Sequence, residues 1–221
     1  MEEDRIKQDI IEVGKRLYYK GFVASNDGNI SVRISEDEIW ITPTGISKGY
    51  MAVEDLIKVN MDGEVLDGTK KPSSEMKMHL AVFRIRPDVR AVVHAHPPKA
   101  TAFAVANLAF DRIALPEVIF SLGNISLAEY GTPTTDELPA SIEKHINCAD
   151  ALLLANHGAL TVGIDPLDAY FKMETLEHFA SIAIYARVLG GEKFLDERQT
   201  EQLYRIRREV YGKKDLPRKG D

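Results

Sequence analysis

The chain contains Val92-Val93-His94-Ala95-His96-Pro97-Pro98 and Ala155-Asn156-His157-Gly158, two short stretches around which its fold is organised. Each follows a run of apolar residues, which is typical of a buried strand. Side chains alternate between the two faces of an extended strand, so His94 and His96 are expected to point to the same side, close enough to bind one ion. A third imidazole at His157 would complete a three-nitrogen site for a divalent metal, with room left for water or substrate.

A single histidine in a sequence is more often a core or loop residue than a ligand. This is the interpretation for His79, His145 and His178. A His-x-His pair that ends a β-rich run and precedes two prolines is harder to explain by packing. From the residues alone, metal binding and a packing role remain equally open for this pair.

The composition, with 44% hydrophobic and 28% charged residues, is that of an ordinary globular protein. A chain of 221 residues is long enough to bury a full hydrophobic core without disulfides. The net charge of −6 argues against nucleic acid as a partner. Cys148 is the one cysteine, which predicts a structural thiol in a reducing compartment. The acidic N-terminus is unlike a secretory signal, and no apolar run has the length of a membrane span. We therefore expect a cytoplasmic protein with no membrane partner.

Hydrophobic periodicity predicts one α/β domain over residues 1–221, with a basic tail from about residue 212 that composition alone would leave solvated. Helices are expected at 5–20, from 76 until Pro87, and at 98–107, 134–145, 166–190 and 196–211. Strands are expected at 30–34, 39–41, 56–60, 64–66, 89–93, 151–155 and 159–162, with short strands and loops over 112–127.

Three turns are rich in small, hydroxyl and amide residues: 25–29, 42–45 and Ser73-Ser74. Such turns offer backbone N–H groups and short donors that suit a phosphate, although loops commonly have this composition. Ser73, Ser74 and Glu75 are equally suited to start a helix. Beside a metal held by three histidines, however, a carboxylate such as Glu75 could move a proton on the carbon next to a metal-polarised carbonyl.

Five motifs occur in one order along the chain, from the first expected helix nearly to the C-terminus. They are Gly28-Asn29-Ile30-Ser31, Ile41-Thr42-Pro43-Thr44-Gly45, Lys71-Pro72-Ser73-Ser74-Glu75, Val93-His94-Ala95-His96 and Asn156-His157-Gly158. This ordered set strongly resembles the class II aldolase/adducin family, and within it the L-fuculose-1-phosphate aldolases most closely.

The resemblance implies a three-layer α/β/α fold around a mixed, largely antiparallel sheet. It also implies a C4 homotetramer with active sites between neighbouring subunits and a sugar phosphate as the small-molecule substrate. Glu75 matches the catalytic acid/base, and Tyr211 resembles a tyrosine that reaches into the adjacent subunit's site. The residues that match the zinc ligands are His94, His96 and His157, and those that match the phosphate cradle are Gly28, Asn29, Thr44, Gly45, Ser73 and Ser74.

One position departs from the fuculose-phosphate aldolases, which place a proton-donating tyrosine in a loop where this chain has Leu115. Glu117 lies two residues further on and could supply that proton, or it could be a solvated loop carboxylate. No tyrosine follows until Tyr130. The missing tyrosine therefore puts in question which aldehyde portion the substrate carries, more than it puts in question the aldol reaction.

The expected activity is zinc-dependent cleavage of a ketose 1-phosphate into dihydroxyacetone phosphate and an aldehyde. L-Fuculose 1-phosphate and a 5-deoxy- or 5-methylthio-pentulose 1-phosphate would suit. A ribulose-5-phosphate 4-epimerase is an alternative, but such enzymes carry Asp where this chain has Glu75. A methylthioribulose-1-phosphate dehydratase should differ in sequence around Glu75, and a non-catalytic adducin-like interaction domain has no need of the three histidines.

Overall fold

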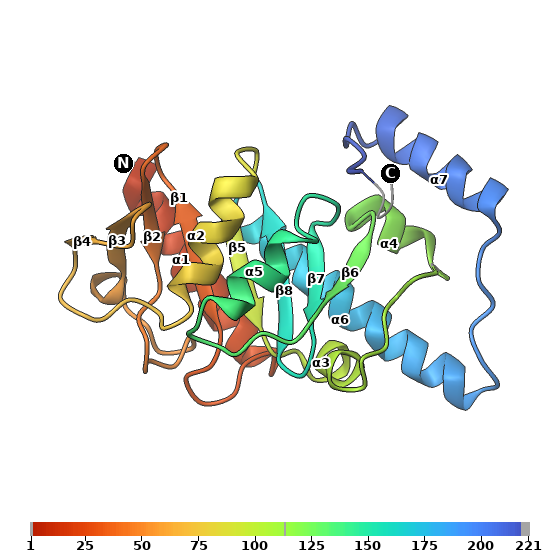
Figure 1. Cartoon of the computed structure of the whole chain (residues 1–221), viewed down its shortest axis with the longest axis horizontal. Coiled ribbons are helices and arrows are strands. Elements are labelled where there is room, and N and C mark those ends of the chain that lie inside the picture. Colours follow the sequence, from red (N-terminus) through yellow and green to blue (C-terminus); the bar gives the residue numbers. More distant parts are fainter. Residues whose placement is uncertain (1, 113, 218–221) are drawn as a thin grey trace.

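One mixed sheet runs through the computed structural model, which describes residues 2–112 and 114–217 (Figure 1). The strand order is β4-β3-β2-β1-β5-β8-β7-β6. β6 and β7 are parallel, and the other neighbouring pairs are antiparallel. The strands in the described part of the chain are β1 (Asn29–Arg33), β2 (Glu38–Ile41), β3 (Ile57–Asn60), β4 (Val65–Asp67), β5 (Ala91–Ala95), β6 (Ile125–Ala128), β7 (Ala151–Leu154) and β8 (Gly158–Gly163).

Helices cover both faces of the sheet, with α2 and α5 on one face and α1, α3 and α6 on the other (Figure 1). A buried apolar cluster fills the space between each helical layer and the sheet. The expected three-layer α/β/α fold around a largely antiparallel sheet is therefore confirmed. Over the described residues, the helices are α1 (Glu2–Tyr19), α2 (Met76–Ile85), α3 (Pro98–Val105), α4 (Pro116–Ser121), α5 (Glu137–Glu143), α6 (Pro166–Val188) and α7 (Glu197–Glu209), with a 3₁₀ turn η1 (Val53–Asp55).

β5 is the strand that positions the predicted metal ligands. It lies between β1 and β8 in the middle of the sheet, and all five of its residues are buried. Its apolar residues face both helical layers, because a strand with helices on each side has no solvated face. His94 is therefore fully enclosed, whereas His96 follows the strand and emerges at its end.

One sequence-based prediction of local structure was wrong. Residues 112–127 were expected to form short strands and loops, but they contain the helix α4 as well as the strand β6. Pro116 occupies the first turn of α4, where its missing N–H costs nothing, and six residues are too few to show helical periodicity. The helix start predicted over Thr134-Thr135-Asp136-Glu137 is confirmed, since Asp136 is the N-cap and the helix begins at Glu137.

The isolated histidines differ in their surroundings. His79 and His145 are buried, as expected of core residues, whereas His178 lies exposed on α6 and is neither a core nor a loop residue. Cys148 is half-buried and carries a free thiol. Over the residues that the structure describes, no helix combines the length and apolarity needed to cross a membrane.

Candidate functional site

Three imidazoles from two parts of the chain meet at one point beside the sheet. His94 is in β5, His96 follows it, and His157 lies in the tight turn between β7 and β8. Because β5 and β8 are paired, this turn is brought next to the end of β5. One ligand nitrogen from each ring lies within 4.8 Å of the other two. The structure thus brings together all three residues predicted to be metal ligands.

In His94 and His96, a partner on Nδ1 orients the ring so that Nε2 faces inward. His94 Nδ1 lies 2.9 Å from the Ala159 carbonyl oxygen, which can only accept, so the hydrogen-bond network assigns the proton to Nδ1. His96 Nδ1 lies 3.5 Å from the Asp27 carboxylate. Burial lowers the pKa of His94 to about 3 and also lowers the pKa of His96, so both rings stay neutral.

The inward-facing nitrogens fit a divalent cation. His94 Nε2 and His96 Nε2 lie only 3.1 Å apart, and two lone pairs at that distance repel unless a cation lies between them. A carbonyl or carboxylate partner on the other ring nitrogen is typical of metal-binding histidines, because it fixes the tautomer and raises the basicity of the ligand. The described residues therefore form a group that could hold a metal ion.

The Glu75 carboxylate lies against the same imidazoles. Its Oε2 is 3.3 Å from His94 Nε2, and its Oε1 is 3.2 Å from His157 Nε2. Burial alone raises the pKa of Glu75, but the groups around it, among them the Asn29 amide that donates to Oε2 at 2.8 Å, lower it well below its ordinary range. Glu75 stands at the N-cap of α2 but makes no capping hydrogen bond. Its side chain faces the histidines instead of closing the helix.

Two glycines allow the backbone to come close to the histidines. A Cβ on Gly158 would lie 2.5 Å from His96 Cδ2 and 2.7 Å from the Ala95 carbonyl oxygen. Gly28 has a φ of +74°, and a Cβ there would lie 2.6 Å from Val23 and 3.0 Å from the His94 carbonyl oxygen. Both positions exclude a side chain, so the loops can pack directly on the ends of the strands.

The three hydroxyl-rich turns surround one cavity of about 190 Å³ next to Glu75 and His96. Backbone hydrogen bonds hold the second and third turns together, from Thr44 N to Lys71 O at 3.1 Å and from Ser73 N to Thr42 O at 3.1 Å. All the residues predicted to form the phosphate cradle line this cavity. Its full lining is Asn26, Asp27, Gly28, Asn29, Pro43, Thr44, Gly45, Ser73, Ser74, Glu75 and His96.

Lys48 is a residue of this region that the sequence did not single out. Its side chain is 1% exposed, and its Nζ donates to the carbonyl oxygens of Asn26 at 3.0 Å and Ile46 at 2.6 Å. Burial lowers the pKa of Lys48 to about 8, and Asp27 raises it by a smaller amount. A buried cation thus joins the first of the three turns, through Asn26, to Ile46, the residue that follows the second turn. No sequence pattern links a lysine at 48 to a carbonyl at 26.

Two predicted catalytic residues lie away from this cavity in the described chain. Glu117 is exposed in the first turn of α4. The Tyr211 ring stacks on Phe120 of the same helix, with ring centroids 5.0 Å apart, and is half exposed. Neither residue lines the cavity beside the histidines. In one chain, Glu117 and Tyr211 therefore lie on and against α4, apart from the cavity that Glu75 lines.

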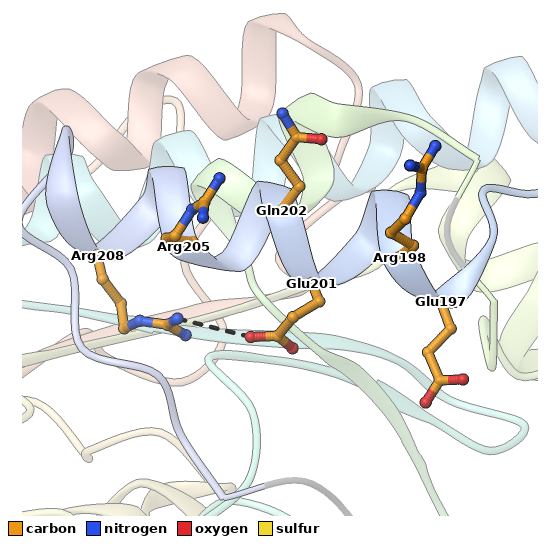
Figure 2. A pocket seen from close by; sticks show the side chains of 6 residues that line it. All are labelled: Glu197, Arg198, Glu201, Gln202, Arg205 and Arg208. Carbon is orange, nitrogen blue, oxygen red and sulfur yellow. Dashed lines mark ion pairs between the residues drawn. The ribbon is translucent and has the colours of Figure 1, made fainter.

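A larger hollow of about 630 Å³ runs along α7 and has different chemistry. Its lining side chains all project from this one helix, and an Arg208–Glu201 ion pair is among them (Figure 2). The lining contains neither a histidine nor a buried acid, so it offers no metal ligands of the kind found at the end of β5. The full set is Glu197, Arg198, Glu201, Gln202, Arg205 and Arg208.

The chain is similar to known proteins over most of its length. Residues 8–184 match the model of the Class II Aldolase and Adducin N-terminal domain. The chain is 32% identical to the 3-oxo-tetronate 4-phosphate decarboxylase of Haemophilus influenzae, over 85% of this chain and 89% of the relative. It is 33% identical to the 5-deoxy-D-ribulose 1-phosphate aldolase of Bacillus thuringiensis, over 89% of this chain and 92% of the relative.

A solved structure of an L-fuculose 1-phosphate aldolase superposes with a TM-score of 0.85 at 31% identity, covering 91% of this chain and 95% of that one. The similarity thus extends over nearly the whole of both chains. Because the family model also covers the three histidines, Glu75 and all the cavity residues, the chain belongs to the class II aldolase and adducin family.

Proposed function

We propose that the protein is a zinc-dependent aldolase that cleaves a ketose 1-phosphate into dihydroxyacetone phosphate and an aldehyde. L-Fuculose 1-phosphate and a 5-deoxy- or 5-methylthio-pentulose 1-phosphate are the proposed substrates. The observation that carries the proposal is the placement of the Glu75 carboxylate within 3.3 Å of two of three converging imidazoles, beside a cavity rich in hydroxyls and backbone amides.

Zinc held by His94, His96 and His157 would supply Lewis-acid stabilisation of the negative charge that develops on the substrate's oxygens. Glu75 adds or removes a proton at the substrate carbon that lies between the carbonyl carbon and the carbon–carbon bond that is cleaved. In the synthetic direction it removes a proton from the hydroxymethyl carbon of dihydroxyacetone phosphate; in cleavage it returns that proton to the same carbon. A carboxylate kept ionised by Asn29 and lying beside the imidazoles is suited to this transfer.

The cavity binds the phosphate of the substrate in this proposal. The phosphate accepts hydrogen bonds from the hydroxyls of Thr44, Ser73 and Ser74. It also accepts from backbone N–H groups of the turns that contain Gly28 and Gly45. Ser73 and Ser74 also precede α2, so its N-terminal dipole favours an anion there. Binding at this end fixes the reactive carbon next to Glu75.

The deciding experiment measures product release from a panel of ketose 1-phosphates with a coupled assay for dihydroxyacetone phosphate. We expect turnover of at least one substrate, loss of turnover after chelation, and recovery on adding zinc. Bound metal is quantified in the same preparations. A protein that holds zinc but releases no dihydroxyacetone phosphate from any member of the panel would contradict the proposed reaction.

A second candidate is decarboxylation of a 3-oxo sugar acid phosphate, favoured by the 32% identity to the Haemophilus decarboxylase. Loss of carbon dioxide and aldol cleavage both leave negative charge next to a carbonyl, so one metal and one carboxylate can serve either reaction. Testing 3-oxo-tetronate 4-phosphate apart from the ketose panel, with carbon dioxide release as the readout, separates the two reactions, because its decarboxylation also yields dihydroxyacetone phosphate whereas aldol cleavage releases no carbon dioxide.

We also propose that the protein is a homotetramer in which Tyr211 of one copy reaches the site of its neighbour. Support comes from the family resemblance and from the position of Tyr211, half exposed and outside its own chain's cavity. Glu117 lies on α4, the helix on which the Tyr211 ring packs, and we propose it as a second group that could exchange a proton with the aldehyde oxygen. Light scattering at several protein concentrations tests the assembly.

Deleting the chain after Val210 should lower turnover by about 10-fold or more while zinc content stays near that of the intact chain, because the ligands lie elsewhere. Tyr211→Phe is the matched variant, since it removes only the hydroxyl. If both variants turn over substrate at the normal rate, Tyr211 has no catalytic role.

Lys48→Met should weaken binding of inorganic phosphate and raise KM for the sugar phosphate by about 10-fold, with a smaller effect on kcat. Methionine fills a similar volume but cannot bridge the carbonyls of Asn26 and Ile46, so the two loops separate. Isothermal titration with phosphate checks this, and Lys15→Met on the exposed side of α1 is the control. Unchanged phosphate affinity in Lys48→Met would contradict the role given to Lys48.

A further inference from the structure

A buried row of polar side chains lies behind Glu75, between α2 and β1. His79 follows Glu75 by four residues and therefore lies on the same side of α2, one turn along. Asn29 and Ser31 are two residues apart in β1 and point to the same face of the sheet. His79 and Ser31 are 0% exposed and Asn29 is 4% exposed. Polar groups this deeply enclosed must satisfy one another.

Only one set of proton positions satisfies the row. Ser31 Oγ lies 2.6 Å from His79 Nδ1, His79 Nε2 contacts Asn29 Oδ1, and Asn29 Nδ2 donates to Glu75 Oε2 at 2.8 Å. The amide oxygen of Asn29 can only accept, so His79 must carry its proton on Nε2. His79 Nδ1 then accepts from the Ser31 hydroxyl. Every hydrogen in the row points toward Glu75.

The end of the Asn29 amide that faces Glu75 and the tautomer of His79 depend on each other. If the amide were reversed, its oxygen would repel the Glu75 carboxylate, and its NH₂ could bond to His79 only if that ring carried its proton on Nδ1 instead of Nε2. Glu75 Oε2 is thus held by a fixed donor. Glu75 Oε1, in contrast, is buried with no hydrogen-bond partner and lies on the side of His157.

We propose that His79 is a positioning residue that, through Asn29, reserves Glu75 Oε2 as the anchored oxygen and leaves Glu75 Oε1 as the oxygen that carries the transferred proton. The inference rests on the proposed function of Glu75 as the acid/base. It assigns His79 no contact with substrate or metal. Its effect passes entirely through the orientation of the Asn29 amide.

The tautomer of His79 tests the inference without any substrate. In zinc-free protein with ¹⁵N-labelled histidine, we expect His79 to show a protonated Nε2 and an unprotonated Nδ1 at neutral pH, with the Nε2 proton protected from solvent. Adding zinc should leave this pattern in place, because the ring is not a ligand. A His79 ring protonated on Nδ1, or averaging between tautomers, would overturn the proposal.

Two substitutions separate positioning from packing. In His79→Gln the side-chain amide NH₂ occupies nearly the place of Nε2 and can still donate to Asn29, whereas in His79→Asn it ends near the place of Nδ1 and cannot. We expect kcat to fall about 10–100-fold in His79→Asn, the size typical of lost outer-shell partners, and to recover most of that loss in His79→Gln. KM, affinity for inorganic phosphate and zinc content should change little in either variant.

The outcomes also separate this inference from the proposed function. If no sugar phosphate is turned over by the wild-type protein, the proposed function fails, and the tautomer measurement still decides the hydrogen-bond row. If the wild-type protein is active and both His79 variants lose kcat equally, the donor to Asn29 is not what matters and the positioning role is rejected. The positioning role is supported if His79→Asn and His79→Gln lose the same thermal stability but His79→Asn loses much more kcat.

Discussion

Glu75→Gln should retain its metal and its fold but lose about 10²–10⁴-fold in kcat, the range that a general acid or base contributes. Glutamine has the shape of glutamate, and its amide oxygen can accept the hydrogen bond that Asn29 donates to Oε2. Its amide nitrogen then lies where Oε1 faces His157, and an amide cannot take up the transferred proton. The substitution therefore removes the proton transfer with little change in packing.

A half-reaction isolates this step from the aldehyde. Dihydroxyacetone phosphate incubated with the zinc-loaded protein in D₂O should exchange one proton of its hydroxymethyl carbon for deuterium, which proton NMR follows. Exchange should be lost in Glu75→Gln and retained in Glu12→Gln, which changes an exposed carboxylate on α1 that pairs with Arg16. Wild-type exchange in Glu75→Gln would show that another group is the base.

The shared side of His94 and His96 could be predicted from a short-range rule, whereas the position of His157 beside them depends on the pairing of β5 with β8. Alternation along a strand puts His94 and His96 on one side, and the apolar run before each stretch predicts the buried strands β5 and β7 that lead to the histidines. The helix that begins after Glu75 follows from Pro72 and the serines, but the direction of the Glu75 side chain does not. A carboxylate before a helix usually caps it, whereas this one makes no cap and faces the imidazoles.

Contacts between distant turns could not be predicted in the same way. Lys48 joins two loops through backbone carbonyls, which carry no sequence signal, and His79 has the pattern of an ordinary core residue. The spacing of Asn29-x-Ser31 on a strand and Glu75-x-x-x-His79 on a helix matches only once α2 is known to lie over β1. The short helix α4 was not predicted, because six residues are too few to show the hydrophobic periodicity of a helix.

His96→Ala should abolish tight zinc binding. The remaining imidazoles of His94 and His157, even with the neighbouring carboxylate, supply one strong ligand fewer than the three-histidine site. His96 is half-buried at the end of β5, so the loss of its ring removes little core packing. The unfolding temperature gives a readout independent of turnover. Zinc at a free concentration 100 times its dissociation constant stabilises a folded protein by about 2.7 kcal/mol. For a chain of this size that corresponds to roughly 5–10 °C in Tm.

The wild-type protein should show this rise in Tm on adding zinc, and His96→Ala should not. His178→Ala is the matched control, because it removes an exposed imidazole on α6 and should leave the zinc-dependent rise unchanged. Since zinc-free His96→Ala and zinc-free wild type differ only by a half-exposed side chain, their unfolding temperatures should be close. A full zinc-dependent rise in His96→Ala would mean that the ion is bound by other groups, and the three-histidine site would have to be abandoned.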